Sequence, residues 1–321
     1  MRQGATTVKG IHHIGLSVSD LDRALAFYRS TTTLDSTARR TVTGDARYRG
    51  NDHPQTGPVE VAVLNGPNAY LELAQIVPAA SADSEPLPVE GPGVTHVCFQ
   101  SPAPSKLYSR FIDHGATAVS RGDAPIALSG NGVRYGYARD ADGIMFEVEQ
   151  IDEPRFDDPV WIAHVSLVSP DIDRLVAFYE NLLGVAPYGR ANKLTGPRLD
   201  EVTGIDGVRI RAAWFNAGNM VLELWEYVTP ATPEPAAPRA FDAAGYNRFV
   251  FEVSDVDREV ERLSGDGVEF LEPPSELVAD SEGHGGREAY ARDPDGNLFG
   301  LVQFSPGSEM SLDRLKRIHW M

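Results

Sequence analysis

The chain has one cysteine and no long apolar run. Cys98 is the only cysteine among 321 residues, which excludes an intramolecular disulfide and a zinc site built from several thiolates. No segment approaches the roughly 18 consecutive apolar residues that span a bilayer. The first ten residues, MRQGATTVKG, lack the apolar core of a signal peptide. We therefore expect a cytoplasmic protein.

Basic residues are also scarce. The chain has 29 Lys and Arg against 46 Asp and Glu, a net charge of −17. Nucleic acids and anionic membranes both attract proteins through a basic surface, so we expect neither as a partner. The remaining expectation is a small-molecule substrate, bound by a monomer or a homodimer.

What the sequence does contain is an internal repeat. HIGLSVSDLDRALAFY, which begins at His13, returns as HVSLVSPDIDRLVAFY at His164, an offset of 151 residues. AYLELAQIV (69–77) returns at the same offset as MVLELWEYV (220–228). YARDADGIMFEVEQ (137–150) returns as YARDPDGNLFGLVQ (290–303), an offset of 153. A register this constant indicates a tandem duplication, with copies at 1–152 and 153–305 and a tail at 306–321.

Each copy divides again into two modules. An alternating strand, an amphipathic helix and further strands recur four times, at roughly 1–78, 92–151, 160–229 and 245–304. The sequences DADG (140–143) and DPDG (293–296) predict tight hairpins before the last strand of a module. The pattern predicts an α+β fold of four βαβββ modules.

Four ionisable residues of the first copy lie in strands that otherwise consist of core residues: His13, Glu72, His96 and Glu147. A charge between apolar neighbours must face solvent, be paired or bind a metal. For one glutamate alone, the solvent-facing side of a strand is the more frequent explanation, but here the same strand positions recur from module to module. Two His and two Glu form a ligand set suited to Ni, Co, Zn, Mn or Fe. Four such ligands on an octahedral ion leave two adjacent positions for a bidentate substrate.

The second copy keeps only half of this set. The equivalent residues are His164, Glu223, Arg248 and Gly300, and the spacing of 59 residues between the first two is preserved. A guanidinium has no lone pair for a metal and glycine has no side chain. We therefore predict one divalent metal ion per chain.

These motifs resemble the vicinal oxygen chelate superfamily, which includes glyoxalase I, methylmalonyl-CoA epimerase, extradiol dioxygenases and bleomycin resistance proteins. The resemblance rests on the two segments that begin at His13 and His164, the two Leu-Glu-Leu strands and the two hairpins, and it covers nearly the whole chain. It implies that modules pair into two open β-barrel domains. One of these would hold a complete metal site and the other a degenerate one.

The set His13, Glu72, His96 and Glu147 is similar to the ligand pattern of bacterial glyoxalase I. The resemblance implies a lyase or isomerase that chelates two neighbouring substrate oxygens, with Glu147, or else Glu72, as the catalytic base. An Fe(II)-dependent extradiol dioxygenase is the first alternative, although such enzymes usually place their metal in the second domain, which is the degraded one here. A resistance protein that binds a small molecule without turnover is the second alternative.

The sequence leaves open which modules pair. Pairing within each copy gives the site His13, Glu72, His96 and Glu147. Pairing of the second module with the third gives His96, Glu147, His164 and Glu223. We expect pairing within each copy because contiguous segments lose less entropy on closing a loop. The short joint between the copies, 151–160, argues the other way.

Overall fold

Two mixed β-sheets of nine strands form the molecule, and they confirm the predicted α+β fold of four modules. The computed structural model describes residues 6–43, 57–76, 86–154, 156–235, 243–277 and 285–316. Parts of the two Pro-containing segments that connect modules one and two (78–93) and modules three and four (229–245) lie outside these residues. No described helix is long and apolar enough to cross a membrane.

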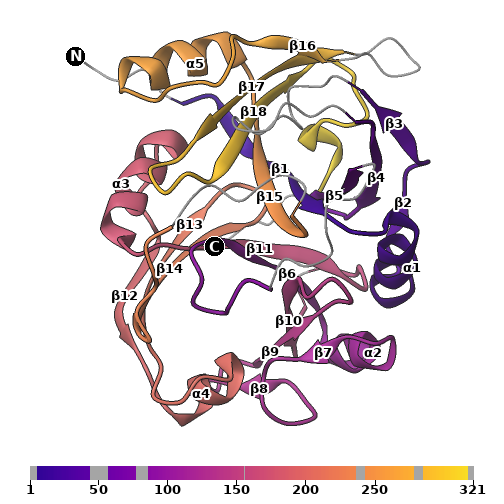
Figure 1. The fold of residues 1–321 in the computed structure, drawn as a ribbon, viewed down its shortest axis with the longest axis vertical. Helices are drawn as coiled ribbons and strands as arrows, with labels where there is room; N and C mark the ends of the chain where they lie inside the picture. The colour runs from indigo at the N-terminus through magenta and orange to yellow at the C-terminus, as the bar shows by residue number, and fades with distance from the viewer. Residues whose placement is uncertain are drawn as a thin grey trace.

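The first sheet, here called the outer barrel, combines strands from the two ends of the chain. Its strands run in the order β16-β17-β18-β15-β1-β5-β4-β2, with β3 beside β4. Their bounds are β1 Val8–Ser17, β2 Asp35–Ser36, β3 Arg40–Val42, β4 Val59–Asn65, β5 Tyr70–Ile76, β15 Gly245–Val253, β16 Ser275–Leu277, β17 Gly286–Arg292 and β18 Leu298–Phe304. In Figure 1 this sheet fills the upper half, where indigo and orange-yellow strands lie side by side.

The second sheet, the inner barrel, comes from the middle of the chain. Its order is β12-β13-β14-β11-β6-β10-β9-β7, with β8 beside β9. Its strands are β6 Gly93–Pro102, β7 Thr117–Ala118, β8 Ile126–Ala127, β9 Val133–Arg139, β10 Met145–Ile151, β11 Trp161–Val168, β12 Gly189–Leu194, β13 Arg209–Asn216 and β14 Val221–Thr229.

The prediction that neighbouring modules pair within each copy is wrong. The first strands of modules two and three, β6 and β11, are antiparallel neighbours, and so are β1 and β15 of modules one and four. The modules that pair are those joined by the shorter link, because β10 ends at Ile151 and β11 begins at Trp161, whereas β5 ends at Ile76 and β6 begins only at Gly93. The lower loop-closure entropy therefore favours the pairing of modules two and three. The boundaries of the sequence copies at 152 and 305 remain a prediction.

The helices lie outside the sheets and begin in a repeated way. Their bounds are α1 Leu21–Thr32, α2 Leu107–Asp113, α3 Ile172–Leu183, α4 Pro197–Thr203 and α5 Val256–Gly265, with short 3₁₀ turns η2 Ala103–Ser105 and η3 Leu312–Arg314. In every module a side chain at the end of the last strand accepts a backbone N–H from the first turn of the helix. The acceptors are Gln75, Gln150, Glu226 and Gln303. These groups satisfy N–H donors that have no partner within a helix.

The segments that make up the sequence repeat hold the two barrels together. The hydroxyl of Tyr28 on α1 donates to Asp140 in the hairpin of the next module, at 2.9 Å. The pair Tyr179 and Asp293 repeats this contact at 2.8 Å in the second copy. Each copy is therefore tied together by helix-to-hairpin contacts, while its two modules belong to different sheets.

Candidate metal centre

Four strands of the inner barrel bring two imidazoles and two carboxylates to one point. They are His96 on β6, Glu147 on β10, His164 on β11 and Glu223 on β14, and one ligand atom of each lies within 4.8 Å of all the others. Glu147 Oε2 is 3.4 Å from Nε2 of His96 and 2.8 Å from Nε2 of His164. Glu223 Oε2 is 3.8 Å and 3.4 Å from the same two nitrogens.

Burial makes this convergence informative. All four side chains are less than one-tenth exposed. Among the described residues, Nε2 of both histidines and Oε2 of Glu223 find no hydrogen-bond partner of acceptable geometry. Buried polar atoms in folded proteins are nearly always satisfied. Three such atoms aimed at a common point therefore fit a ligand between them, and two His and two Glu are a donor set that divalent metals accept.

The charges in the cluster depend on one another. Burial alone would lower the pKa of His164, but the carboxylates of Glu223 and Glu147 outweigh it and raise that pKa. Burial alone would raise the pKa of Glu147, and its two imidazole neighbours lower it instead. A positive charge at this point therefore stabilises the carboxylates, and a divalent ion would take the place of the proton.

Neighbouring side chains orient two of the ligands. The indole Nε1 of Trp214 donates to Oε1 of Glu223 at 2.6 Å. The hydroxyl of Thr95 lies 3.1 Å from Nδ1 of His96, so the opposite ring nitrogen faces the cluster. Such partners around a metal site fix the tautomer and the direction of its ligands.

A β-bulge aims His164. The register of β11 against β6 shifts between Ile162 and His164. Buried Asn68, which belongs to module one, holds the bulge: its side chain accepts the N–H of Ile162 at 3.1 Å and donates to the carbonyl of the same residue at 2.7 Å. Asn219 does the same for Ile11 in β1, at 2.9 and 2.8 Å. A bulge redirects the side chains beside it. Each barrel therefore supplies an asparagine that orients a histidine of the other barrel.

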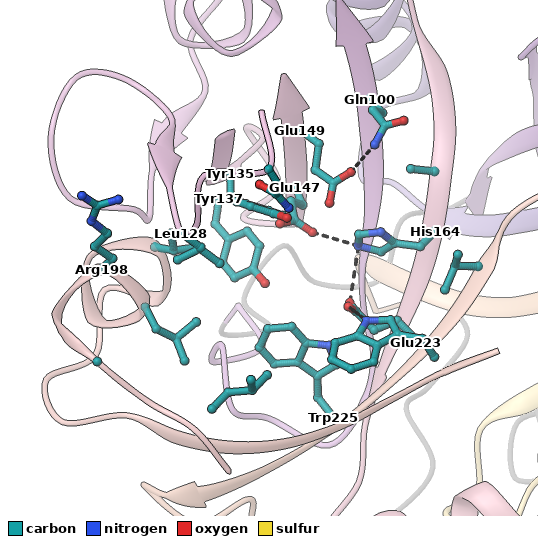
Figure 2. A pocket seen from close by; sticks show the side chains of 18 of the residues that line it. Gln100, Leu128, Tyr135, Tyr137, Glu147, Glu149, His164, Arg198, Glu223 and Trp225 are labelled. Atoms are coloured by element: carbon teal, nitrogen blue, oxygen red, sulfur yellow. Dashed lines mark hydrogen bonds and ion pairs between the residues drawn. The ribbon is translucent and has the colours of Figure 1, made fainter. Parts of the chain in front are cut away.

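The cluster opens onto a cavity of about 900 Å³ in the inner barrel. Glu147, His164 and Glu223 form part of its wall, and His96 is not among its lining residues. Figure 2 shows these three side chains pointing toward one another, with Trp225 next to Glu223 and Arg198 on the far side. The strand alternation predicted from the sequence thus places the ligand atoms inside the barrel.

A third carboxyl in the cavity escaped the sequence analysis. Glu149 follows Glu147 by two residues on β10, so both side chains face the cavity. Burial and the neighbouring Glu147 raise the pKa of Glu149 to about 7. The side-chain amide of Gln100 donates to Glu149, and Trp161 Nε1 donates to Gln100 at 2.8 Å. The sequence does carry a sign of this residue. At the equivalent position, the second copy has Val302, so the glutamate is present only in the copy that keeps Glu147.

The outer barrel receives His13 and Glu72, the other two predicted ligands. They lie on β1 and β5, apart from the cluster that contains His96 and Glu147. The place of a metal is taken by the fully buried guanidinium of Arg248, which donates to Glu72 through Nη2. Arg40 lies 3.7 Å from the other oxygen of Glu72. Glu72, proposed as a second base, is therefore neutralised and is not part of the inner site.

Two further positions of the outer barrel differ from their equivalents at the inner site. Gly300, at the Glu147 position, has the ring of Tyr290 against it, and a Cβ there would lie 2.5 Å from Cε1 of that ring. The tail covers the end of the sheet: the Glu252 carboxylate accepts the Ser311 hydroxyl at 2.7 Å and the Leu312 N–H at 2.6 Å. Glu252 is the repeat equivalent of Gln100, which lines the inner cavity.

Comparisons with known proteins agree with the fold and the repeat. The model of the Glyoxalase/Bleomycin resistance protein/Dioxygenase superfamily matches residues 10–148 and again 161–301. An ethylmalonyl-CoA/methylmalonyl-CoA epimerase from Cereibacter sphaeroides is 25% identical over 148 residues, 44% of this chain and 97% of its own. A 2-epi-5-epi-valiolone epimerase from an Actinomyces species is 29% identical over 153 residues, 46% of this chain and 82% of its own.

Among solved structures, glyoxalase I from Zea mays superimposes with a TM-score of 0.60 at 20% identity, covering 92% of each chain. At that identity the likeness concerns the fold, and it extends over both barrels. The two family matches together cover most of the sequence. The chain therefore belongs to the Glyoxalase/Bleomycin resistance protein/Dioxygenase superfamily.

Proposed function

We propose that the inner barrel binds one divalent metal ion through His96, Glu147, His164 and Glu223 and catalyses proton transfer at a carbon next to two chelated substrate oxygens. The observation that carries this proposal is the buried convergence of the four side chains at the wall of a cavity. A metal held there would act as a Lewis acid on the two oxygens.

Glu147 is the better candidate for the base. The Oε1 atom of Glu223 is held by the indole of Trp214 at 2.6 Å. Among the described residues, the ion pairs of the Glu147 carboxylate are with the two imidazoles of the cluster, and no indole, amide or hydroxyl donates to it. Glu147 therefore has more freedom to turn toward a substrate. It would take a proton from the carbon beside one oxygen and return it to the same or the neighbouring carbon, which describes an epimerase or isomerase.

The known activities of the relatives are consistent with this reaction class. Two of them are named as epimerases and the structural neighbour as glyoxalase I. Four protein ligands and two substrate oxygens complete an octahedral shell, which leaves no position for dioxygen. The proposal therefore favours an oxygen-independent reaction over the dioxygenase alternative.

Hydrogen exchange tests this proposal directly. The probe is 2-hydroxyacetophenone, which has two adjacent oxygens and exchangeable C–H bonds, in D2O under nitrogen with Ni- or Co-loaded protein. We expect the protein to accelerate deuterium incorporation, followed by NMR, and Glu147→Gln to abolish the acceleration. Equal rates for Glu147→Gln and the unaltered protein would refute the role of Glu147. Strict dependence on Fe(II) with stoichiometric oxygen uptake would replace the proposal with the dioxygenase reading.

A further inference from the structure

We infer that the inner cavity selects a ring-containing, largely apolar substrate with at most one anionic group, located at the end far from the metal. This inference rests on the proposed function, because the metal cluster defines the near end of the cavity. It concerns the substrate class, which the cluster alone does not determine.

The walls beside the cluster are aromatic. Trp214 and Trp225 line the cavity together with Tyr135 and Tyr137. Trp214 lies opposite Glu223 in the sheet, and Trp225 follows Glu223 by two residues, so both stand next to a proposed ligand. Flat rings offer stacking surfaces to a ring-containing molecule.

The outer barrel shows that these aromatic walls are not a requirement of the fold. The repeat equivalents of Trp214 and Trp225 are Val63 and Ala74, on β4 and β5. The fold thus accommodates small aliphatic residues at both positions, and in the inner barrel the same two positions carry indoles beside the His/Glu cluster and the cavity. The two tryptophans therefore belong to ligand recognition in the inner barrel.

One of these indoles has an unused hydrogen-bond donor. Trp225 is 8% exposed, and among the described residues its Nε1 has no hydrogen-bond partner. A buried N–H without a partner is costly, and a ligand oxygen would remove that cost. Trp225 lies two residues after Glu223 on β14, so its side chain is on the same face of the sheet. Its Nε1 could therefore donate to a substrate oxygen close to the two chelated oxygens.

The described lining of the cavity has one arginine and no lysine. Among the described lining residues, Arg198 is the one with a guanidinium or ammonium group, and it stands across the cavity from His164 (Figure 2). Its Nη1 donates to the carbonyl of Ala127 at 2.8 Å, which fixes the head group there. One cation can pair with one carboxylate. A substrate attached to a nucleotide or to an acidic peptide carries several anionic groups. The described lining offers only one cation to pair with them.

Binding of three hydroxamates to metal-loaded protein, measured by calorimetry, tests the inference. Acetohydroxamate provides the chelating head alone, 2-naphthohydroxamate adds a ring body, and 6-carboxy-2-naphthohydroxamate adds one distal anion. We expect about ten-fold tighter binding for the naphthyl probe than for acetohydroxamate. Trp225→Phe keeps an aromatic ring and removes the N–H donor, so it should weaken naphthyl binding by about five-fold while metal content stays the same.

The distal carboxylate should tighten binding a further three-fold or so, and Arg198→Gln should abolish that gain. Lys193→Gln removes an exposed cation outside the lining and should retain the gain. Equal affinity for acetohydroxamate and naphthohydroxamate would overturn the inference while leaving the metal site intact. Failure of acetohydroxamate to bind in a metal-dependent way would instead refute the proposed function. Tighter binding of methylmalonyl-CoA than of either naphthyl probe would also overturn the inference.

Discussion

The two barrels share one architecture and differ in what fills the middle. In the inner barrel four strands supply His96, Glu147, His164 and Glu223, and a cavity opens beside them. In the outer barrel the corresponding strands supply His13, Glu72, Arg248 and Gly300, and the guanidinium of Arg248 contacts the carboxylate. In the outer barrel the cation is a side chain of the protein itself, Arg248, whereas the inner barrel has room for a metal ion. The fold needs a positive charge near its buried carboxylates, and a metal or an arginine can provide it.

The sharpest test of this comparison is metal binding. We expect one tightly bound metal per chain, and His96→Ala, Glu147→Ala and His164→Ala should each abolish tight binding. The loss of metal affinity should exceed the roughly 10- to 100-fold that follows removal of a residue that only hydrogen-bonds to a metal ligand. His13→Ala should leave binding unchanged, because its strand belongs to the other barrel.

Elemental analysis after metal loading and gel filtration measures all of these variants. Two tightly bound ions per chain would contradict the assignment of the outer barrel as degenerate. Loss of metal in His13→Ala together with retention in His164→Ala would contradict the pairing on which the site depends.

The next effect concerns the internal cation. Arg248→Met removes the buried guanidinium that contacts the carboxylate of Glu72, which is 4% exposed. Arg40, 3.7 Å from the other oxygen of Glu72, is exposed and cannot replace a buried partner. Breaking a buried pair from one side costs about 3–5 kcal/mol. We expect a loss of that order in the free energy of unfolding, measured by urea titration. The double variant Arg248→Met, Glu72→Gln should recover part of it. A single variant as stable as the unaltered protein would show that Arg248 does not neutralise Glu72.

The sequence predicted the parts of this comparison better than their assembly. The amphipathic helix of each module, the hairpin at 140–143 and the loss of ligands at Arg248 and Gly300 all follow from local pattern and repeat register. The repeat could not show which strands share a sheet, because all four modules present equivalent first strands to a partner. Asn68 and Asn219 differ by 151 residues, the repeat offset, yet their role depends on contact between strands of different modules. The repeat shows that Glu149 is absent from the second copy, where Val302 takes its place. That Glu149 and the two tryptophans line one cavity depends on which strands share a sheet, which the repeat does not reveal.

The asparagine pair offers a smaller and more selective effect. Asn68→Ala leaves the N–H and the carbonyl of Ile162 without their side-chain partner, at a cost of about 2–3 kcal/mol. Because the bulge aims His164, metal affinity should also fall, by about ten-fold. Asn219→Ala is the matched control, since it loosens the bulge beside His13: it should lose similar stability and retain its metal affinity.

Urea titration and competition with a metal chelator provide the two readouts. If both asparagine variants lose metal affinity equally, the effect is a general loosening of the structure and Asn68 has no specific role in positioning His164.

The smallest effect is one in which the two copies should behave alike. Asp140 and Asp293 occupy the two hairpins, and burial raises the pKa of each to about 6. A carboxyl whose pKa is higher in the folded state than in the unfolded chain binds its proton more tightly when folded. Its contribution to stability is therefore present below pH 4 and is lost as the pH rises through 6. Between pH 5 and pH 7 each residue should lower the free energy of unfolding by about 1 kcal/mol.

Asp140→Asn should remove this slope while its side-chain oxygen still accepts the N–H groups of Asp142 and Ile144, now at 2.9 and 3.0 Å. We expect the unaltered protein to lose stability relative to the variant from pH 5 to pH 7, measured by urea titration at both values. Asp293→Asn should give the same sign, because Tyr179 repeats the contact of Tyr28. Parallel pH profiles for the unaltered protein and both variants would show that the hairpin carboxyls titrate normally. A slope lost in only one variant would mean that the two hairpins differ in electrostatics despite their common sequence, as the two barrel centres do.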